Sequence, residues 1–139
     1  MTLDDSAGGQ GEQLVRIITC VQRETARVER VLPSVDHLAL RRRGVDTASV
    51  HADIGRHGPA EMLEPFESWR QLLRDFDAAT GRLSELRDTA GDGPDYQRRL
   101  DAAINEARRC RHAVEEASAD LCRRVAAHID AALAHRVGL

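Results

Sequence analysis

The sequence predicts an all-α protein: an elongated bundle of about four helices that ends in a long antiparallel helical hairpin. Apolar residues recur every three or four positions over long stretches, which is the period of an amphipathic helix. Alanine and charged residues are abundant, whereas aromatic residues make up only 3% of the chain. This composition is typical of long helices and coiled coils rather than of β-sandwiches.

The chain is long enough for one domain with a single core, because it has 139 residues. Residues 1–11 contain three glycines and no apolar pattern, so we predict a disordered tail there and one helical-bundle domain over 12–139. The tail lacks the basic and apolar regions of a signal peptide. The three cysteines cannot all pair, and we therefore expect reduced thiols and a cytoplasmic location.

The first helix is predicted over residues 12–32, where apolar positions alternate by spacings of four and three, as in a coiled-coil seam. Pro33 should end it, since the residue before a proline is pushed out of the helical region. Residues 35–57 have a weaker pattern that Gly44 interrupts. We predict a broken helix there, or two short helices, with Asp46 capping the second.

The third helix is predicted to run from Pro59 or Pro65 to Asp88. If it begins at Pro65, the proline occupies the first turn, where its missing N–H is harmless; if it begins at Pro59, a kink is expected near Pro65. This helix carries the largest apolar surface of the chain and should form the centre of the core. Its stripe consists of Met62, Phe66, Trp69, Leu72, Leu73, Phe76 and Leu83.

The last helix is predicted over residues 95–137, after a turn-forming segment at 89–94 that should close an antiparallel hairpin. Such a helix spans roughly 60 Å, about twice the diameter of a small domain. Its apolar stripe is rich in alanine and needs a partner along its whole length. We therefore expect a homodimer, with an interface formed by Leu100, Val114, Leu121, Val125 and Ile129.

No pattern in the chain points to catalysis or to a bound cofactor. There is no glycine-rich phosphate loop, nucleophile elbow or zinc-protease motif, and no cysteine and histidine share a helix face at metal-ligand spacing. Cys110 and Cys122 fall on or beside the apolar stripe, where cysteine packs as a small hydrophobic residue. We expect no enzymatic activity, no metal and no cofactor.

All 20 basic residues are arginine, which is typical of a high-GC genome and favours a bacterial source. The favoured function is a non-catalytic interaction or scaffold protein that binds itself or another protein. One alternative is a regulatory domain that senses a small molecule or an anion, in a pocket between the third and fourth helices lined by Phe66, Trp69 and Cys110. The anion would be held by Arg41, Arg42 and Arg43, the densest basic run in the chain. A second alternative is a nucleic-acid-binding regulator, although no segment is strongly basic. No apolar run is long enough to span a membrane.

Overall fold

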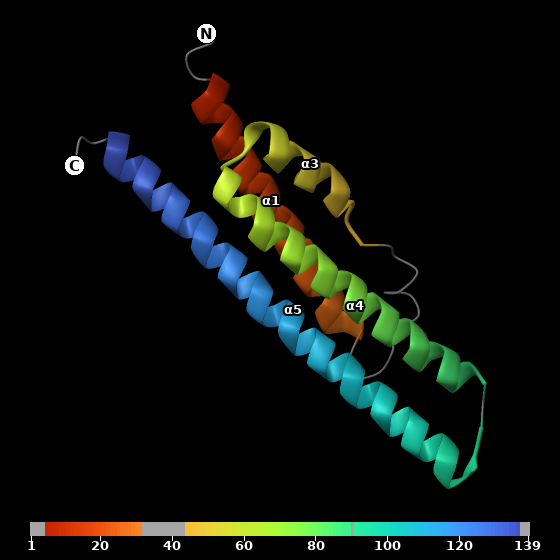
Figure 1. The fold of residues 1–139 in the computed structure, drawn as a ribbon. Helices are drawn as coiled ribbons and strands as arrows, with labels where there is room; N and C mark the ends of the chain where they lie inside the picture. Colours follow the sequence, from red (N-terminus) through yellow and green to blue (C-terminus); the bar gives the residue numbers. More distant parts are fainter. Residues whose placement is uncertain (1–4, 32–43, 90, 137–139) are drawn as a thin grey trace.

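The protein is an elongated bundle of helices (Figure 1). The computed structural model describes residues 5–31, 44–89 and 91–136, and the side chains of 11–31, 44–89 and 91–134. No strand occurs in these described ranges. The elements are α1 (Asp5–Val31), α3 (Thr47–His57), a short 3-10 helix (Ala60–Met62), α4 (Leu63–Asp88) and α5 (Gly93–Arg136). The predicted fold class, an all-α bundle with a long C-terminal helix, is confirmed.

Three long helices form the core, and α3 packs alongside α1 and α4 (Figure 1). The chain runs down α4 and back along α5, so these two helices form the predicted antiparallel hairpin. The first helix also lies antiparallel to α5. Both the start of α1 and the end of α5 extend past the start of α4, which leaves this end of the bundle thinner than its middle.

The first helix begins earlier than predicted. Residues 5–11, which we predicted to be part of a disordered tail, belong to α1. Glycine lowers helix propensity by about 1 kcal/mol per residue but does not forbid a helix, and each residue added to a formed helix gains a hydrogen bond. The prediction therefore gave the glycines too much weight. The predicted end of this helix lies outside the described residues, as does the first of the two short segments expected over 35–57.

The predicted cap of the second short helix is confirmed. The carboxylate of Asp46 accepts a hydrogen bond of 3.2 Å from the backbone N–H of Ala48, which lies in the first turn of α3. Such a cap satisfies one of the N–H groups that have no partner within the helix.

The start of α4 decides between the two predictions made for its prolines. The backbone N–H of Met62 donates to the carbonyl of Pro59 at 3.0 Å, forming the 3-10 turn, and the α-helix begins only at Leu63. Pro65 is then in the first turn, where a missing N–H costs nothing. The α-helix thus begins between the two predicted starts, two residues before Pro65; the placement of Pro65 in the first turn and the predicted end at Asp88 are confirmed.

The hairpin turn is held by one aromatic side chain. The hydroxyl of Tyr96 donates to the carbonyl of Leu86 at 2.8 Å, and its ring lies against Gly91, where a Cβ would come within 2.6 Å of the Tyr96 Cδ2 atom. Gly93 begins α5 with a φ of 92°, a backbone conformation that favours glycine. These contacts explain why the chain turns sharply between α4 and α5.

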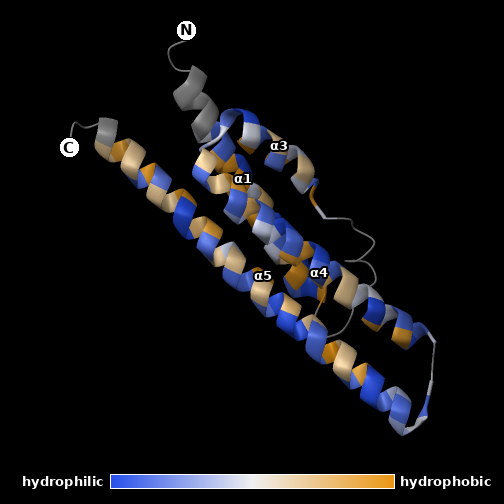
Figure 2. Cartoon of the chain, in the orientation of Figure 1, coloured by the Kyte–Doolittle hydropathy of each residue, from blue (hydrophilic) through white to orange (hydrophobic). Residues whose placement is uncertain are grey.

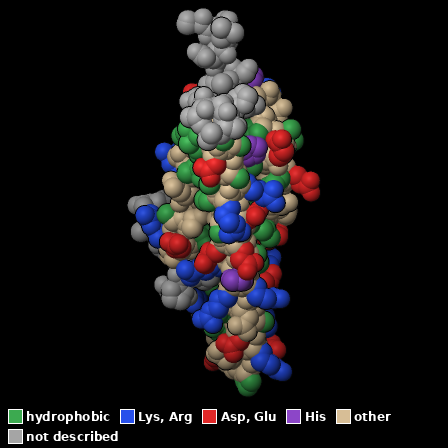
Figure 3. All heavy atoms as spheres, turned by 90° about the vertical axis from the view of Figure 1, so that its left-hand side faces the viewer, with side chains coloured by type: hydrophobic (Ala, Val, Ile, Leu, Met, Phe, Trp, Pro, Cys, Tyr) green, Lys and Arg blue, Asp and Glu red, His purple; other side chains and the backbone are tan. Residues whose placement is uncertain are grey.

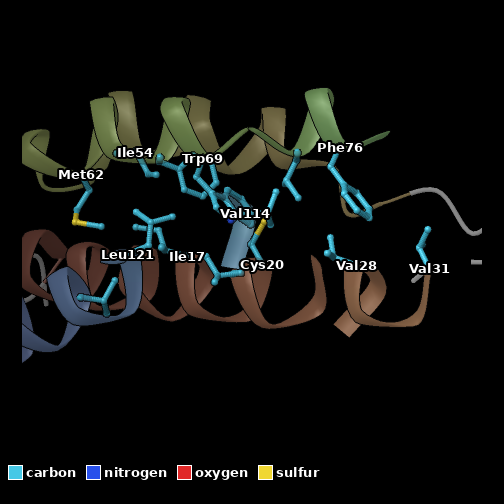
Figure 4. Packing of buried hydrophobic residues seen from close by; sticks show 14 of the residues in the cluster. Ile17, Cys20, Val28, Val31, Ile54, Met62, Trp69, Phe76, Val114 and Leu121 are labelled. Carbon is cyan, nitrogen blue, oxygen red and sulfur yellow. The ribbon is translucent and has the colours of Figure 1, made fainter. Parts of the chain in front are cut away.

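The core lies where α1, α4 and α5 meet, and Figure 4 shows its side chains pointing inward from these helices and from α3. The three largest side chains of α4, which are Phe66, Trp69 and Phe76, are fully buried, as expected for the centre of the core. The rings of Phe66 and Trp69 have centroids 5.2 Å apart. The buried apolar residues labelled in Figure 4 are Ile17, Cys20, Val28, Val31, Ile54, Met62, Trp69, Phe76, Val114 and Leu121.

One carboxylate is buried beside this core. Glu24 on α1 is 2% exposed and accepts hydrogen bonds from the backbone N–H of Val45 and from Nε of Arg27, the latter at 2.8 Å. The guanidinium of Arg27 also holds Asp77 of α4, with N–O distances of 2.8 and 3.2 Å. Burial alone would lower the pKa of Arg27, but the contacts with Asp77 and Glu24 raise it above its usual value. The cluster of Glu24, Arg27 and Asp77 joins α1, α4 and the segment that leads into α3.

Candidate interaction surface

Most of the residues predicted to form a dimer interface lie inside the chain's own core. Val114, Leu121 and Val125 are buried against the other helices, and Leu100 is partly buried against the same cluster. Ile129 is 45% exposed. The stripe that we expected to need a second chain is therefore covered mainly by α1 and α4, and only its C-terminal end remains open.

A chain of hydrogen bonds sets α1, α4 and α5 at one level. The indole N–H of Trp69 donates to Oγ of Ser118 at 3.0 Å, and the Ser118 hydroxyl lies 3.2 Å from Oγ1 of Thr25. The Thr25 hydroxyl lies 2.7 Å from the carbonyl of Val21, one turn earlier in α1. Thr25 of α1 is therefore level with Ser118 of α5.

Beside this contact, α1 and α5 form an open groove with a volume of about 450 Å³. Small side chains line much of it, which would let another backbone approach closely. The residues around it are Val21, Gln22, Thr25, Ala26 and Glu29 from α1, and Glu115, Ser118, Ala119 and Cys122 from α5.

The residues that border the groove follow a coiled-coil spacing on both helices. On α5 they continue from Cys122 in steps of four and three, so Ala126, Ile129 and Leu133 share its side of the helix. We call the row Glu115, Ala119, Cys122, Ala126, Ile129 and Leu133 the α5 seam. The row Ile18, Gln22, Ala26 and Glu29 on α1 has the same kind of spacing, and we call it the α1 seam.

Two of the three exposed large apolar side chains lie at one end of the α5 seam. Among the described side chains, the large hydrophobic residues that are exposed are Val15, Ile129 and Leu133, with exposed fractions of 65%, 45% and 53%. Val15 is at a similar level on α1, but it lines a separate hollow between α1 and α3, together with Thr19 and Val50. Figure 2 shows apolar colours continuing along α5 past the start of α4. In Figure 3, apolar atoms lie toward the upper end and charged side chains alternate below.

The opposite end of the groove is acidic. Glu29 and Glu115 are both exposed and both line the groove. Glu115 accepts a hydrogen bond of 2.8 Å from Nε of Arg111, the preceding turn of α5. Glu29 makes no ion pair with another described residue. The two seams thus run from an acidic end to an apolar end in the same direction.

The structure places the residues of the alternative small-molecule site differently from the prediction. Phe66 and Trp69 are fully buried, and the Trp69 N–H is satisfied by Ser118, so both side chains are part of the packed core. Cys110 is only partly buried, on the α5 side of the core. Arg41, Arg42 and Arg43 lie outside the described residues. No contact described here brings these predicted ligand-binding residues together.

The described residues contain no group of three or more histidine, cysteine, aspartate or glutamate side chains arranged to hold a metal ion. Nε2 of His112 lies 3.0 Å from Oε1 of Glu116, and both side chains are exposed on α5. Burial, followed by the nearby Glu106 carboxylate, raises the pKa of the Cys110 thiol above its usual value. This thiol is therefore less ionised at neutral pH than a free cysteine.

Cys20 predicts a measurable pH dependence of stability. Burial and then the Glu24 charge raise its pKa to about 12, against about 8.5 for an unfolded cysteine. Above about pH 9 the unfolded thiol loses its proton while the folded thiol keeps it, so the free energy of unfolding falls as pH rises. In urea unfolding under reducing conditions, the free energy of unfolding should fall more steeply between about pH 9 and 11 for the wild type than for Cys20→Ala. Parallel curves would contradict the raised pKa.

No family model, curated protein or solved structure matches this chain. Within the described residues, no helix combines the length and the hydropathy that a membrane span requires.

Proposed function

We propose that this chain is a non-catalytic helical interaction module that binds a helix in the groove between α1 and α5. The observation that supports this most directly is the position of the exposed apolar residues. Ile129 and Leu133, two of the three exposed large hydrophobic residues among the described side chains, continue the row of α5 residues that lines this groove. Exposed apolar residues that gather at one site, rather than scatter singly, mark interaction surfaces.

The geometry of the groove supports a helix as its occupant. Two neighbouring rows with coiled-coil spacing form the holes into which the side chains of another helix can pack. Binding of an amphipathic helix in such a groove is a common mode of protein recognition. The proposal keeps the sequence-based expectation of helix-mediated association but moves it from the inward stripe of α5 to the α1 and α5 seams.

Site-specific photo-crosslinking in the native host tests this proposal. A photoreactive residue at Ala126, in the α5 seam, should give a discrete protein adduct. The same residue at the adjacent Ala127, which is also exposed, should not, because it lies about 100° further around the helix. The Leu133→Glu substitution should remove the Ala126 adduct while the circular dichroism spectrum stays unchanged. Equal crosslinking from both positions, or none from either, would contradict a binding groove.

A further inference from the structure

We infer, on the basis of the proposed function, that the groove binds one amphipathic helix of another protein, with small and apolar residues on one face and arginine or lysine in its last turn. The shape of the groove supports the first half of this statement. The α5 seam from Glu115 to Leu133 covers about 27 Å at the usual rise of a helix, so it fits a helix of about 18 residues. Alanines at 26, 119 and 126 favour a close approach, and therefore small side chains on the partner.

Charge supports the second half. Glu29 and Glu115 stand at the same end of the groove, and the lining residues include no basic side chain to balance them. Arg111 contacts Glu115 from the preceding turn, which leaves Glu29 without an ion pair among the described residues. A partner helix should therefore bring positive charge to this end and apolar residues to the end formed by Ile129 and Leu133.

The charge pattern disfavours a second copy of this chain as the occupant. In a twofold arrangement that keeps neighbouring helices antiparallel, α1 of one copy faces α5 of the other at the same level. That arrangement gathers both copies of Glu29 and Glu115 at one end. In the reversed arrangement, the acidic end of each copy meets the apolar end of the other. The first joins the two apolar ends but also gathers four carboxylates where no lining residue is basic, and the second buries charges against apolar residues, so each arrangement carries an electrostatic cost that a basic partner helix avoids.

The acidic end of the groove, at Glu29 and Glu115, also indicates the direction of the partner helix. Cationic side chains are most favourable in the last turn of a helix, where they interact with the negative end of its dipole. A partner whose last turn lies beside Glu29 and Glu115 runs parallel to α1 and antiparallel to α5. Basic residues in its last turn thus satisfy both the partner's dipole and the acidic end of the groove.

The test uses two synthetic helical peptides of about 18 residues with the same composition. Both carry leucine and alanine at coiled-coil spacing; one has glutamate in the first turn and arginine in the last, and the other has these turns exchanged. Fluorescence anisotropy with the full chain should show about tenfold tighter binding of the peptide with arginine in its last turn. Leu133→Glu should abolish binding of both. The Glu29→Arg, Glu115→Gln variant should remove the preference, and Glu85→Gln, an exposed acid on α4, should keep it.

The outcomes separate this inference from the proposed function. Equal binding of both peptides, or a preference that survives the Glu29→Arg, Glu115→Gln variant, overturns the inference and leaves a helix-binding groove. A dimer in sedimentation velocity that Leu133→Glu dissociates, and that excludes the peptides, shows a second copy as the occupant and also overturns the inference. If no peptide binds, no dimer forms and Ala126 gives no adduct, the proposed function itself fails.

Discussion

Replacing Trp69 with alanine should lower the free energy of unfolding by about 3 to 5 kcal/mol. The indole is fully buried, packs against Phe66 with ring centroids 5.2 Å apart, and donates its N–H to Ser118 at 3.0 Å. The substitution therefore leaves a cavity at the level where α1, α4 and α5 meet. Urea unfolding followed by circular dichroism measures the loss.

Two further variants separate the packing of Trp69 from its hydrogen bond. Trp69→Phe keeps an aromatic ring but removes the donor, and should cost clearly less than alanine. Ser118→Ala removes the acceptor and leaves a buried indole N–H unpaired, which should cost about 1 to 3 kcal/mol. If Trp69→Ala stayed within about 1 kcal/mol of the wild type, the centre of the core would lie elsewhere.

Local sequence patterns predicted most of the helix boundaries, because caps, prolines and turn residues act on the residues next to them. Asp46 before α3, Pro65 in the first turn of α4 and the segment at 89–94 act through backbone preferences that need no tertiary contact. The start of α1 was wrong for the same reason: glycine content is a local signal, and helix formation over residues 5–11 went against it.

The periodicity of α5 showed which residues share a face but not which helix covers that face. Val114, Leu121 and Val125 were assigned to a second chain, whereas α1 and α4 of the same chain bury them. A stripe that looks too long for a monomer can be covered when two long helices of the same chain lie against it. The sequence offered no means of distinguishing these two cases.

The exposure of Ile129 and Leu133 at the end of the α5 stripe has a geometric cause that can be read from the sequence. From Leu121 the predicted stripe continues through Val125, Ile129 and Leu133 in steps of four. Each step of four advances about 40° around the helix, so Leu133 lies about 120° from Leu121. These steps carry the stripe out of the core and onto the α5 seam, which the sequence analysis did not separate from the inward stripe.

The buried cluster at Glu24 was not foreseen, because a glutamate in a helix reads as a solvated residue. Its burial depends on Val45, which lies 21 positions further along the chain, and on Asp77 of α4, which holds the neighbouring Arg27. The nearby Gly44 also leaves room for it, since a side chain there would force the Glu24 carboxylate to move. A single sequence gives no signal for such contacts.

Replacing Arg27 with methionine should destabilise the fold by about 3 to 5 kcal/mol. Methionine keeps the length and the apolar stem of the side chain, so the change tests charge more than packing. It leaves the carboxylate of Glu24 buried with only the Val45 N–H as a partner, and a buried charge without its counter-charge is costly. Thermal and urea unfolding at low and high salt measure the effect, which should depend little on salt because Glu24 is shielded from solvent.

Neutralising Glu24 in the same background should recover much of this loss. The double variant Arg27→Met, Glu24→Gln keeps an oxygen that accepts the Val45 N–H but no longer buries an unpaired charge, so it should be more stable than Arg27→Met alone. Asp77→Asn provides the matched control, because this carboxylate contacts the same guanidinium from an exposed position and should cost about 1 kcal/mol or less. If the double variant were no more stable than Arg27→Met, Arg27 would act through its packing and not through the charge of Glu24.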